Sequence, residues 1–577
     1  MNVLDTIRST AEKHPERQVF RSRFGTLTYG ELWEKSGILA QWLQNQLKED
    51  HSPIPVFGHK EPMMLVCFLA AARCGRPYCP LDMNMPASRI YDIANVTESQ
   101  LLLACRDLPE TSDHIESRHA ADSSTMEAAE NADAAGSPEN KGKNGSAANK
   151  PGAAETPAAR TLHAKVITSS DLEAISSGSF HGEFIGEIDE KYQDRPEDVQ
   201  YIIFTSGSTG KPKGVQISAG ALSNYLDWCS TLSGMDNGVF LNQAPYSFDL
   251  SVMDLYCALA TASGIVSVDK AMEQDMPALL NYLMNSGISC WVSTPSFADL
   301  CLSDPGFNQE SMPQLKRFLF CGETLRNTTA RQLIRRFPDA EVINTYGPTE
   351  STVCVTSVRI TKEMAKSDDA LPIGHAKPGT EIRIETEAGK PASAGESGEM
   401  VILGNTVGAG YYKEADKTAA SFFMEKDGSY IPYPDAAEER IKLLKSGYRA
   451  AYRTGDAGHK DADGLLYYEG RIDKQIKFHG YRIELGDIEN ALLRLDSIKQ
   501  AAVIPNKKDG RIRFLTAFIV PEKDSHLNDT FENRKKIRMA VKQLLPSYMV
   551  PRQIRMLSRM PLTANGKADR KKLESEL

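Results

Sequence analysis

Residues 201–215 read Tyr-Ile-Ile-Phe-Thr-Ser-Gly-Ser-Thr-Gly-Lys-Pro-Lys-Gly-Val, an apolar run that leads into a loop of glycines, hydroxyls and lysines. The apolar run predicts a buried strand. The glycines permit tight turns that expose backbone N–H groups, and the hydroxyl and lysine side chains between them can contact phosphate oxygens. The segment therefore predicts a triphosphate-binding loop, although such a loop alone would also suit a flexible linker. The candidate contacts are Thr205, Ser206, Gly207, Ser208, Thr209, Gly210 and Lys211.

This loop differs from the GxxxxGK[ST] phosphate loop. The spacing between its glycines is different, and Pro212 stands where the helix of that motif would begin. We therefore expect a phosphate loop of another kind.

Short apolar runs alternate with helix-length segments on both sides of the loop. Runs that predict strands lie at 199–204, 265–268, 290–293, 318–320 and 342–344, and segments such as 276–284 and 328–336 predict helices. This alternation predicts an α/β fold in which helices cover parallel or mixed sheets.

Composition changes at two places along the chain. Residues 110–160 contain no aromatic residue, no Leu and no Val, so they cannot bury enough surface to offset the entropy of ordering. We expect a flexible surface insertion there; a partner-binding motif within it is the alternative. A second insertion near 429–447 carries apolar and aromatic side chains, which favour order.

Overall charge and cysteine content limit the possible functions. The 577 residues include 67 Lys and Arg against 76 Asp and Glu, a net charge of −9 that disfavours binding to nucleic acid or anionic membranes. The 10 cysteines are scattered without a CxxC pair, which disfavours zinc sites and disulfides. We find no signal-peptide core and no apolar run long enough to insert into a membrane, and we expect a cytoplasmic protein.

Five further motifs follow the loop in order. They are Asn344-Thr-Tyr-Gly-Pro-Thr-Glu350, Tyr452-Arg-Thr-Gly-Asp456, the segment Gly470-Arg-Ile-Asp-Lys-Gln-Ile-Lys-Phe-His-Gly-Tyr-Arg-Ile-Glu484, Leu545-Pro-Ser-Tyr-Met-Val-Pro551 and Pro561-Leu-Thr-Ala-Asn-Gly-Lys567. Together they resemble the adenylate-forming superfamily of amino-acid adenylation domains, acyl-CoA synthetases and luciferases. The resemblance covers nearly the whole chain outside 110–160. It implies a large N-terminal adenylation domain, residues 1–472, and a small mobile α+β C-terminal lid domain, residues 473–577.

Two segments resemble one branch of this superfamily. Residues 247–254 read Ser-Phe-Asp-Leu-Ser-Val-Met-Asp and residues 318–323 read Phe-Leu-Phe-Cys-Gly-Glu, similar to the members that activate D-alanine for teichoic acid esterification in Gram-positive cell walls. The resemblance implies ATP and Mg²⁺ as cofactors, D-alanine as substrate, and an acidic phosphopantetheinylated D-alanyl carrier protein as partner. The basic residues of the last hundred positions would suit such a partner, or simply form a solvated face. We expect a monomer.

The resemblance also implies where the nucleotide binds. Asp456 would accept both ribose hydroxyls, since a carboxylate has two acceptor oxygens, and Arg471 would contact ribose or phosphate. Tyr346 would offer its ring to adenine, and Glu350 would bind Mg²⁺ as a hard oxygen ligand. The remaining residues implied to contact ATP are Asn344, Thr345, Gly347, Pro348, Thr349, Tyr468 and Gly470.

Five residues take roles in catalysis, substrate binding and domain movement by the same resemblance. Lys567 would contact both the substrate carboxylate and the phosphate and so be catalytic. Asp249 would pair with the substrate ammonium; a strand-end or capping aspartate is the alternative. Cys321 would pack on the α-carbon and favour the D isomer, although on sequence alone an inert buried thiol is the better interpretation. Val353 would line a small methyl pocket, and Asp473 would be the hinge of the C-terminal domain.

Three other functions stay open at this point. The chain could activate glycine or L-alanine for peptide synthesis, or it could be an acyl- or aryl-CoA ligase, which the acid at Asp249 disfavours. A catalytically inactive nucleotide-binding or carrier-docking protein would have no need for Glu350, Asp456 and Lys567 together.

Overall fold

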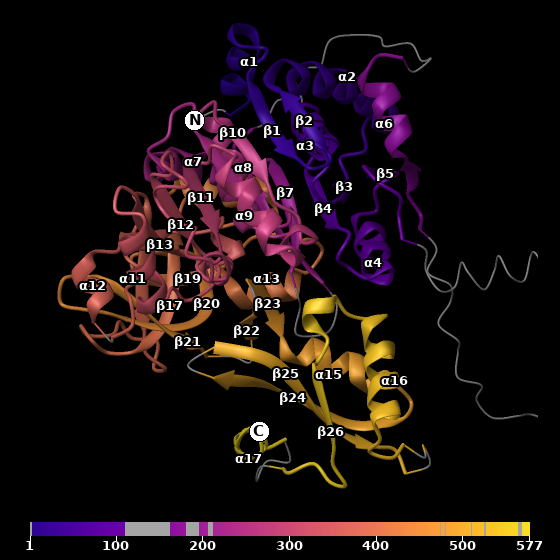
Figure 1. Ribbon diagram of the computed structural model, residues 1–577, viewed down its shortest axis with the longest axis vertical. Helices are drawn as coiled ribbons and strands as arrows, with labels where there is room; N and C mark the ends of the chain where they lie inside the picture. Colours follow the sequence, from indigo (N-terminus) through magenta and orange to yellow (C-terminus); the bar gives the residue numbers. More distant parts are fainter. Residues whose placement is uncertain are drawn as a thin grey trace, which may run out of the picture.

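The computed structural model describes most of the chain as a large N-terminal domain and a smaller C-terminal domain (Figure 1). The described residues are 3–109, 162–179, 195–205, 212–367, 369–472, 475–478, 480–508, 511–523, 525, 527–562 and 568–577. The insertion predicted over 110–160 lies outside them. Within the described residues, no helix combines the length and the hydrophobicity that crossing a membrane requires.

One six-stranded sheet carries the strand that precedes the phosphate loop. Its spatial order is β6 (Lys165–Ile167), β5 (Leu101–Ala104), β3 (Ile54–Gly58), β4 (Tyr78–Asp82), β7 (Val199–Thr205) and β8 (Lys213–Ser218). All neighbours pair in parallel except β7 and β8. The helices of this part of the chain are α1 (Val3–Lys13), α2 (Tyr29–Leu47), α3 (Pro62–Arg73), α4 (Ala87–Thr97) and α6 (Ser169–Ser176).

A nine-stranded sheet forms the centre of the large domain. Its order is β15 (His375–Ala376), β14 (Thr356–Arg359), β13 (Glu341–Tyr346), β12 (Arg317–Phe320), β11 (Cys290–Ser293), β9 (Val239–Asn242), β10 (Gly264–Ser267), β1 (Gln18–Ser22) and β2 (Gly25–Thr28). The run from β13 to β1 is parallel, so the carboxyl ends of these strands meet at one edge, where ligands bind in open α/β sheets. The predicted α/β class is confirmed.

Helix α7 (Ala219–Ser233) leads from β8 to β9 and packs against β7, β8 and α8 (Leu250–Ala260), and the other helices of this region connect the strands of the nine-stranded sheet. Besides α8, these are α9 (Met276–Met284), α10 (Pro295–Cys301), α11 (Asn327–Arg336) and α12 (Lys362–Lys366), with short 3₁₀ turns η2 (Met272–Gln274) and η3 (Thr349–Ser351). Helix α8 is buried along its whole length, which explains its nearly continuous apolar sequence.

A third sheet, largely antiparallel, completes the large domain. Its order is β16 (Thr380–Glu385), β17 (Gly398–Gly404), β20 (Arg449–Lys460), β18 (Phe422–Lys426) and β19 (Ser429–Pro432), with β21 (Leu466–Arg471) also paired to β20. Helix α13 (Ala415–Ser421) precedes β18. The second insertion, near 429–447, forms β19 and helix α14 (Ala437–Lys445), in agreement with the order that its composition predicts.

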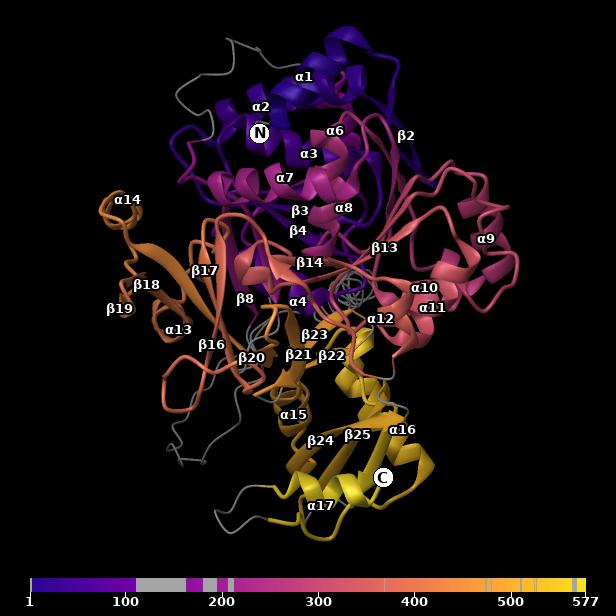
Figure 2. The same ribbon diagram turned by 90° about the vertical axis from the view of Figure 1, so that its left-hand side faces the viewer.

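The C-terminal domain has its own apolar core, which includes Ile488, Val503 and Leu515. Its elements are the hairpin β22 (Gln475–Phe478) and β23 (Tyr481–Glu484), α15 (Leu485–Leu493), β24 (Ile498–Lys508), β25 (Arg511–Pro521), α16 (Phe531–Lys542), η4 (Ser547–Met549), β26 (Gln553–Met556) and α17 (Arg570–Ser575). Figure 2 shows the β22–β23 hairpin on the side that faces the large domain and α17 at the opposite end.

Candidate active site

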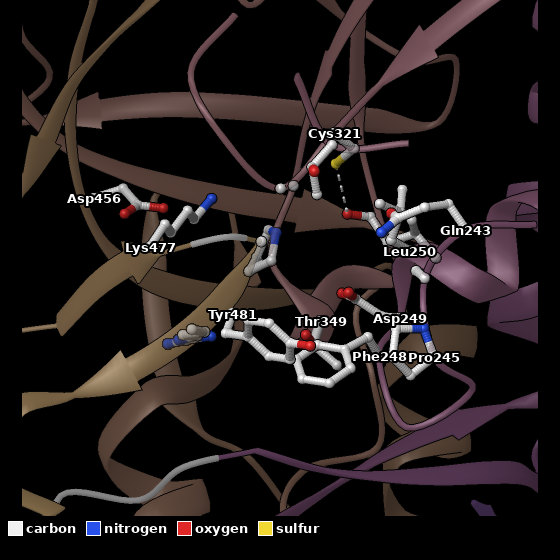
Figure 3. A pocket seen from close by; sticks show the side chains of 18 of the residues that line it. Gln243, Pro245, Phe248, Asp249, Leu250, Cys321, Thr349, Asp456, Lys477 and Tyr481 are labelled. Atoms are coloured by element: carbon white, nitrogen blue, oxygen red, sulfur yellow. Dashed lines mark hydrogen bonds between the residues drawn. The ribbon is translucent and has the colours of Figure 1, made fainter. Parts of the chain in front are cut away.

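A cavity of about 80 Å³ lies where the carboxyl edge of the nine-stranded sheet meets the β22–β23 hairpin (Figure 3). In Figure 3, Asp249 and Cys321 lie toward one side and Asp456 and Lys477 toward the other. Both domains therefore contribute to one site. Its lining residues are Gln243, Ala244, Pro245, Phe248, Asp249, Leu250, Thr294, Cys321, Gly322, Gly347, Pro348, Thr349, Val353, Asp456, Arg471, Lys477, Gly480, Tyr481 and Arg482.

Asp249 is the acid on the first side of the cavity. It stands at the N-cap position of α8, but its side chain makes no capping hydrogen bond, so the simple capping interpretation does not account for it. Burial raises the pKa of the Asp249 carboxyl, and the Thr349 hydroxyl and the Lys477 charge oppose that rise. A carboxylate in such a place favours a cationic group on the ligand.

Cys321 and Val353 form the neighbouring wall. The Cys321 thiol donates a weak hydrogen bond to the Val353 carbonyl oxygen across 3.8 Å. Val353 has φ 66° and Thr352 φ 60°, a left-handed backbone that β-branched residues rarely adopt. A side chain at Gly347 would lie 2.4 Å from Cys354 Cα, so the wall needs glycine there. The backbone at this wall is therefore held in a strained but defined shape.

Asp456 and Arg471 form the opposite side. They face each other across the antiparallel strands β20 and β21, and Arg471 donates to Asp456 Oδ1 at 2.9 Å. The Tyr346 hydroxyl donates to Asp456 Oδ2 at 2.6 Å. The Tyr468 ring lies 6.0 Å from the Tyr346 ring, and the Lys477 ammonium lies within 6 Å of both ring centres. Aromatic faces and a carboxylate side by side suit a nucleoside.

Glu350 lies next to the cavity and is fully buried. Its carboxylate accepts from Arg482 at 2.8 Å and from the Tyr411 hydroxyl at 2.8 Å, and Lys213 Nζ lies 3.4 Å away. Burial alone would raise the pKa of Glu350, but the charges of Arg482 and Lys213 hold that pKa well below its usual range.

The chemistry of Glu350 fits a Mg²⁺ ligand, since the ion prefers hard carboxylate oxygens. Among the described residues, no three His, Cys, Asp or Glu side chains gather closely enough to hold a metal ion. Arg482 holds the Glu350 carboxylate in this structure.

The tip of the β22–β23 hairpin fastens the C-terminal domain to the site. The Gly480 amide donates to Glu323 Oε1 at 2.6 Å, and Gly480 has φ 79°, which glycine adopts without strain. The Tyr481 ring stacks on Tyr548 at 3.7 Å and meets the edge of Phe248 at 4.6 Å. Arg482 reaches Glu350 from the same hairpin. These contacts of the hairpin fix one orientation of the C-terminal domain relative to the large domain, referred to below as the observed pose.

The predicted site residues are distributed between the cavity and its surroundings. Asp249, Cys321, Gly347, Pro348, Thr349, Val353, Asp456 and Arg471 line the cavity. Asn344, Thr345, Tyr346, Tyr468, Gly470 and Thr205 lie outside its lining. Asn344 Nδ2 donates to the Pro372 carbonyl oxygen at 2.8 Å, which fixes the orientation of its amide. The residues Ser206, Gly207, Ser208, Thr209, Gly210, Lys211, Asp473 and Lys567 lie outside the described residues.

The described residues that flank Lys567 in the sequence belong to the C-terminal domain. Leu562 pairs with Ala568, and α17 follows directly. Arg570 in that helix donates to the Val503 carbonyl oxygen at 2.6 Å. Both ribbon views show α17 at the end of the domain remote from the hairpin.

Sequence reasoning did not assign Lys477, Tyr481 and Arg482 to the site. All three stand in the quoted segment 470–484, and the glycine at position 480 marks the turn of a hairpin. The glycine predicts a hairpin turn at this place in the chain. It does not predict which surface of the large domain the hairpin tip contacts.

Comparison with known proteins gives two family models and full-length relatives. The AMP-binding enzyme model matches residues 7–412, and the AMP-binding enzyme C-terminal domain model matches residues 487–567. The D-alanine–D-alanyl carrier protein ligase of Bacillus licheniformis is 39% identical over 584 residues, which covers 100% of both chains. The protein of the same name from Listeria welshimeri is 37% identical over 583 residues, covering 100% of this chain and 99% of its own.

Solved structures with the same fold share less sequence. The Vibrio cholerae adenylation domain AlmE, in complex with glycyl-adenosine-5'-phosphate, gives a TM-score of 0.71 at 21% identity and covers 100% of this chain and 98% of its own. The o-succinylbenzoate CoA synthetase MenE of Bacillus subtilis gives 0.73 at 18% identity, covering 99% and 98%. At these identities the likeness shows the fold of adenylate-forming enzymes.

Proposed function

The chain belongs to the AMP-binding enzyme family, and we propose that it activates D-alanine with ATP and transfers the D-alanyl group to the phosphopantetheine thiol of a carrier protein. The observation that carries this proposal is the acid Asp249 in a small cavity that also contains Cys321 and Val353. A carboxylate there would pair with an amino-acid ammonium, whereas an acyl-CoA ligase has no ammonium to bind. The full-length relatives named for D-alanine support the same choice.

The first step joins a carboxylate oxygen of D-alanine to the α-phosphorus of ATP and breaks the bond to pyrophosphate. Two anions must approach, so a cation between them lowers the barrier. We assign that role to Lys567. Asp249 would hold the ammonium, and Asp456 with Arg471 would hold the ribose. Mg²⁺, when bound with Glu350 as a ligand, would supply neutralising charge at the phosphates.

The second step forms a bond between the thiol sulfur and the D-alanyl carbonyl carbon and breaks the bond to the phosphate oxygen. AMP leaves, and the thiol proton passes to the departing phosphate or to water. We assign the observed pose to this step, because the hairpin carries Lys477 and Arg482 into the cavity while α17 lies at the far end of the domain. The negative charge that develops would then face Lys477.

The first step requires a different pose. The C-terminal domain would rotate about Asp473, the boundary between residues 1–472 and 473–577, to bring Lys567 to the cavity. A phosphopantetheinylated, acidic carrier protein would meet the basic C-terminal domain. The residues that line the cavity all come from one chain, which fits a monomer.

Pyrophosphate exchange tests the proposal directly. Exchange is measured with D-alanine, L-alanine, glycine and a short fatty acid in parallel. D-alanine should give the highest kcat/KM. A preference for glycine or L-alanine would assign the chain to peptide synthesis, fatty-acid-dependent exchange would assign it to acyl activation, and no exchange with any acid would leave only a binding role.

A further inference from the structure

A buried lysine stands behind the amino-acid side of the cavity and has no role in the chemistry above. Lys60 follows β3 and has no solvent exposure. Its Nζ donates to Asn242 Oδ1 at 2.5 Å and to the Ala244 carbonyl oxygen at 2.5 Å. Both acceptors lie at the carboxyl end of β9, in the other sheet. Lys60 therefore ties the two sheets together where the site is built.

Asn242 also forms a hydrogen bond with helix α8, so it links Lys60 to that helix. Its Nδ2 donates to Asp254 Oδ1 at 2.7 Å, and its Oδ1 also accepts from the Ser267 hydroxyl at 2.6 Å. Asn242 and Asp254 have no solvent exposure. Asp254 lies on α8 five positions after Asp249, the acid assigned to the substrate. A continuous set of buried polar contacts thus runs from Lys60 to the helix that carries Asp249.

The contacts hold both ends of residues 243–250. Asn242 and Ala244 are fixed at the start, and Asp254 is fixed just after the end, where α8 begins at Leu250. Six residues of this stretch, including Pro245 and Asp249, line the cavity on the amino-acid side. Since binding an ammonium depends on the position of Asp249, the geometry of this stretch sets the affinity for the amino acid.

The nearby carboxylates partly offset the cost of burying the Lys60 ammonium. Burial lowers the pKa of Lys60 to about 8, and the charges of Asp254, Asp82, Asp269 and Glu273 oppose that change. Asp254 Oδ2 is buried without a hydrogen-bond partner among the described residues. Burying an ammonium is costly, and an apolar side chain would fill the same space without that cost. The arrangement is therefore better explained by the geometry that it imposes than by stability.

We propose that Lys60 is a positioning residue for the amino-acid pocket, acting through Asn242 and Ala244 on the stretch 243–250. It does not touch the substrate. This proposal rests on the proposed function, because it concerns the substrate side of the same site. It predicts that the KM for the amino acid, and not that for ATP, depends on the Lys60 ammonium.

Lys60→Met tests this, because methionine keeps the length of the side chain and removes its donors. In pyrophosphate exchange, the KM for D-alanine should rise about tenfold, while the KM for ATP stays within twofold of the wild type. Arg76→Met is the matched control. Arg76 is also a buried cation and donates to the carbonyl oxygens of Asp50, Cys74 and Lys48, before the amino end of β4 and away from the cavity. It should lower thermal stability and leave both KM values unchanged.

A double variant separates positioning from charge balance. Lys60→Met with Asp254→Asn leaves no unpaired carboxylate, so thermal stability should recover toward the wild type while the KM for D-alanine stays high. Recovery of stability and KM together would overturn the proposal, and so would a KM for D-alanine within twofold of the wild type in Lys60→Met. If neither variant folds, the network holds the whole domain and the proposal is wrong. If the wild type activates another amino acid, the proposed function fails and the same comparison is made with that substrate.

Discussion

Replacing Arg482 by methionine should separate the two half-reactions. The change removes the guanidinium that lies 2.8 Å from Glu350 and keeps the apolar length of the side chain. Arg482 belongs to the hairpin of the C-terminal domain and Glu350 to the large domain, so this ion pair exists only when the hairpin is inserted. Loss of the ion pair destabilises the pose with the inserted hairpin. It does not change the stability of domain orientations in which Arg482 and Glu350 are apart.

The magnitude follows from what remains around Glu350. Removing one partner of a buried ion pair costs about 3–5 kcal/mol, because the other charge is left uncompensated. Lys213 at 3.4 Å and the Tyr411 hydroxyl at 2.8 Å stay in place, so we expect the lower end, about 3 kcal/mol. At about 1.4 kcal/mol per tenfold, the inserted pose would become about 10²-fold less populated.

Two assays read the two steps separately. Amino-acid-dependent pyrophosphate exchange reports adenylation and should stay within threefold of the wild type. Single-turnover transfer of the aminoacyl group to a phosphopantetheinylated carrier protein should slow by about 10²-fold. The control is Arg534→Met, which removes a guanidinium that pairs with Asp529 at 3.2 Å on the surface of the same domain. An equal fall in both assays, or no fall in transfer, would refute the assignment of the observed pose to transfer.

Four further changes test other parts of the site. Cys321→Ala should raise kcat/KM for L-alanine about 10-fold or more with little change for D-alanine, since steric exclusion of a methyl group is worth about 1–3 kcal/mol. If the ratio of kcat/KM for D-alanine to that for L-alanine does not change, Cys321 is an ordinary core thiol. Lys567→Ala should abolish adenylate formation while calorimetry still detects ATP binding, and near-normal pyrophosphate exchange would contradict its role. Glu350→Gln should lower the free energy of unfolding at pH 7. Because folding lowers the pKa of Glu350, ionised Glu350 contributes fully to the free energy of unfolding above its unfolded-state pKa, and this contribution is lost as the pH falls through its folded-state pKa. The difference in free energy of unfolding between wild type and variant, measured with urea, should therefore be smaller at pH 4 than at pH 7. An equal difference at both pH values would argue against the ion pair. Deleting residues 112–158 with a short Gly/Ser join should leave folding and exchange intact, because closing a loop costs only about 0.6 kcal/mol per doubling of its length; an inactive deletion variant would show that the segment contacts the enzyme.

The sequence was sufficient to predict elements whose periodicity is local. The runs at 290–293 and 318–320 coincide with β11 and the end of β12, whereas β13 extends past the predicted run 342–344 to Tyr346, so the motif 344–350 begins within the strand. The pairing of Asp456 with Arg471 needed more than spacing, because fifteen residues separate them in the chain and only the register of β20 on β21 brings them together. The family resemblance named both residues, but the contact between them comes from the sheet.

Contacts that depend on the domain pose could not be predicted in this way. Arg482 and Glu350 are 132 positions apart, and neither residue carries a local signal of the other. The same holds for Lys60, whose partners Asn242 and Ala244 lie in another sheet. A lysine after a strand is usually solvated, so burial of this one becomes visible only when the two sheets are packed.

The position of Arg482 also implies an order of events. Its guanidinium holds Glu350 Oε2 in the observed pose, and Glu350 is the residue that we propose as a Mg²⁺ ligand. The charge of that guanidinium would repel a Mg²⁺ ion bound to the same carboxylate, so the two cations would compete for Glu350. Hairpin insertion would therefore weaken metal binding at Glu350, and a bound metal would disfavour hairpin insertion. Under the proposed function, departure of pyrophosphate with its metal would favour insertion of the hairpin and so the transfer step, with the Arg482 guanidinium beside Glu350.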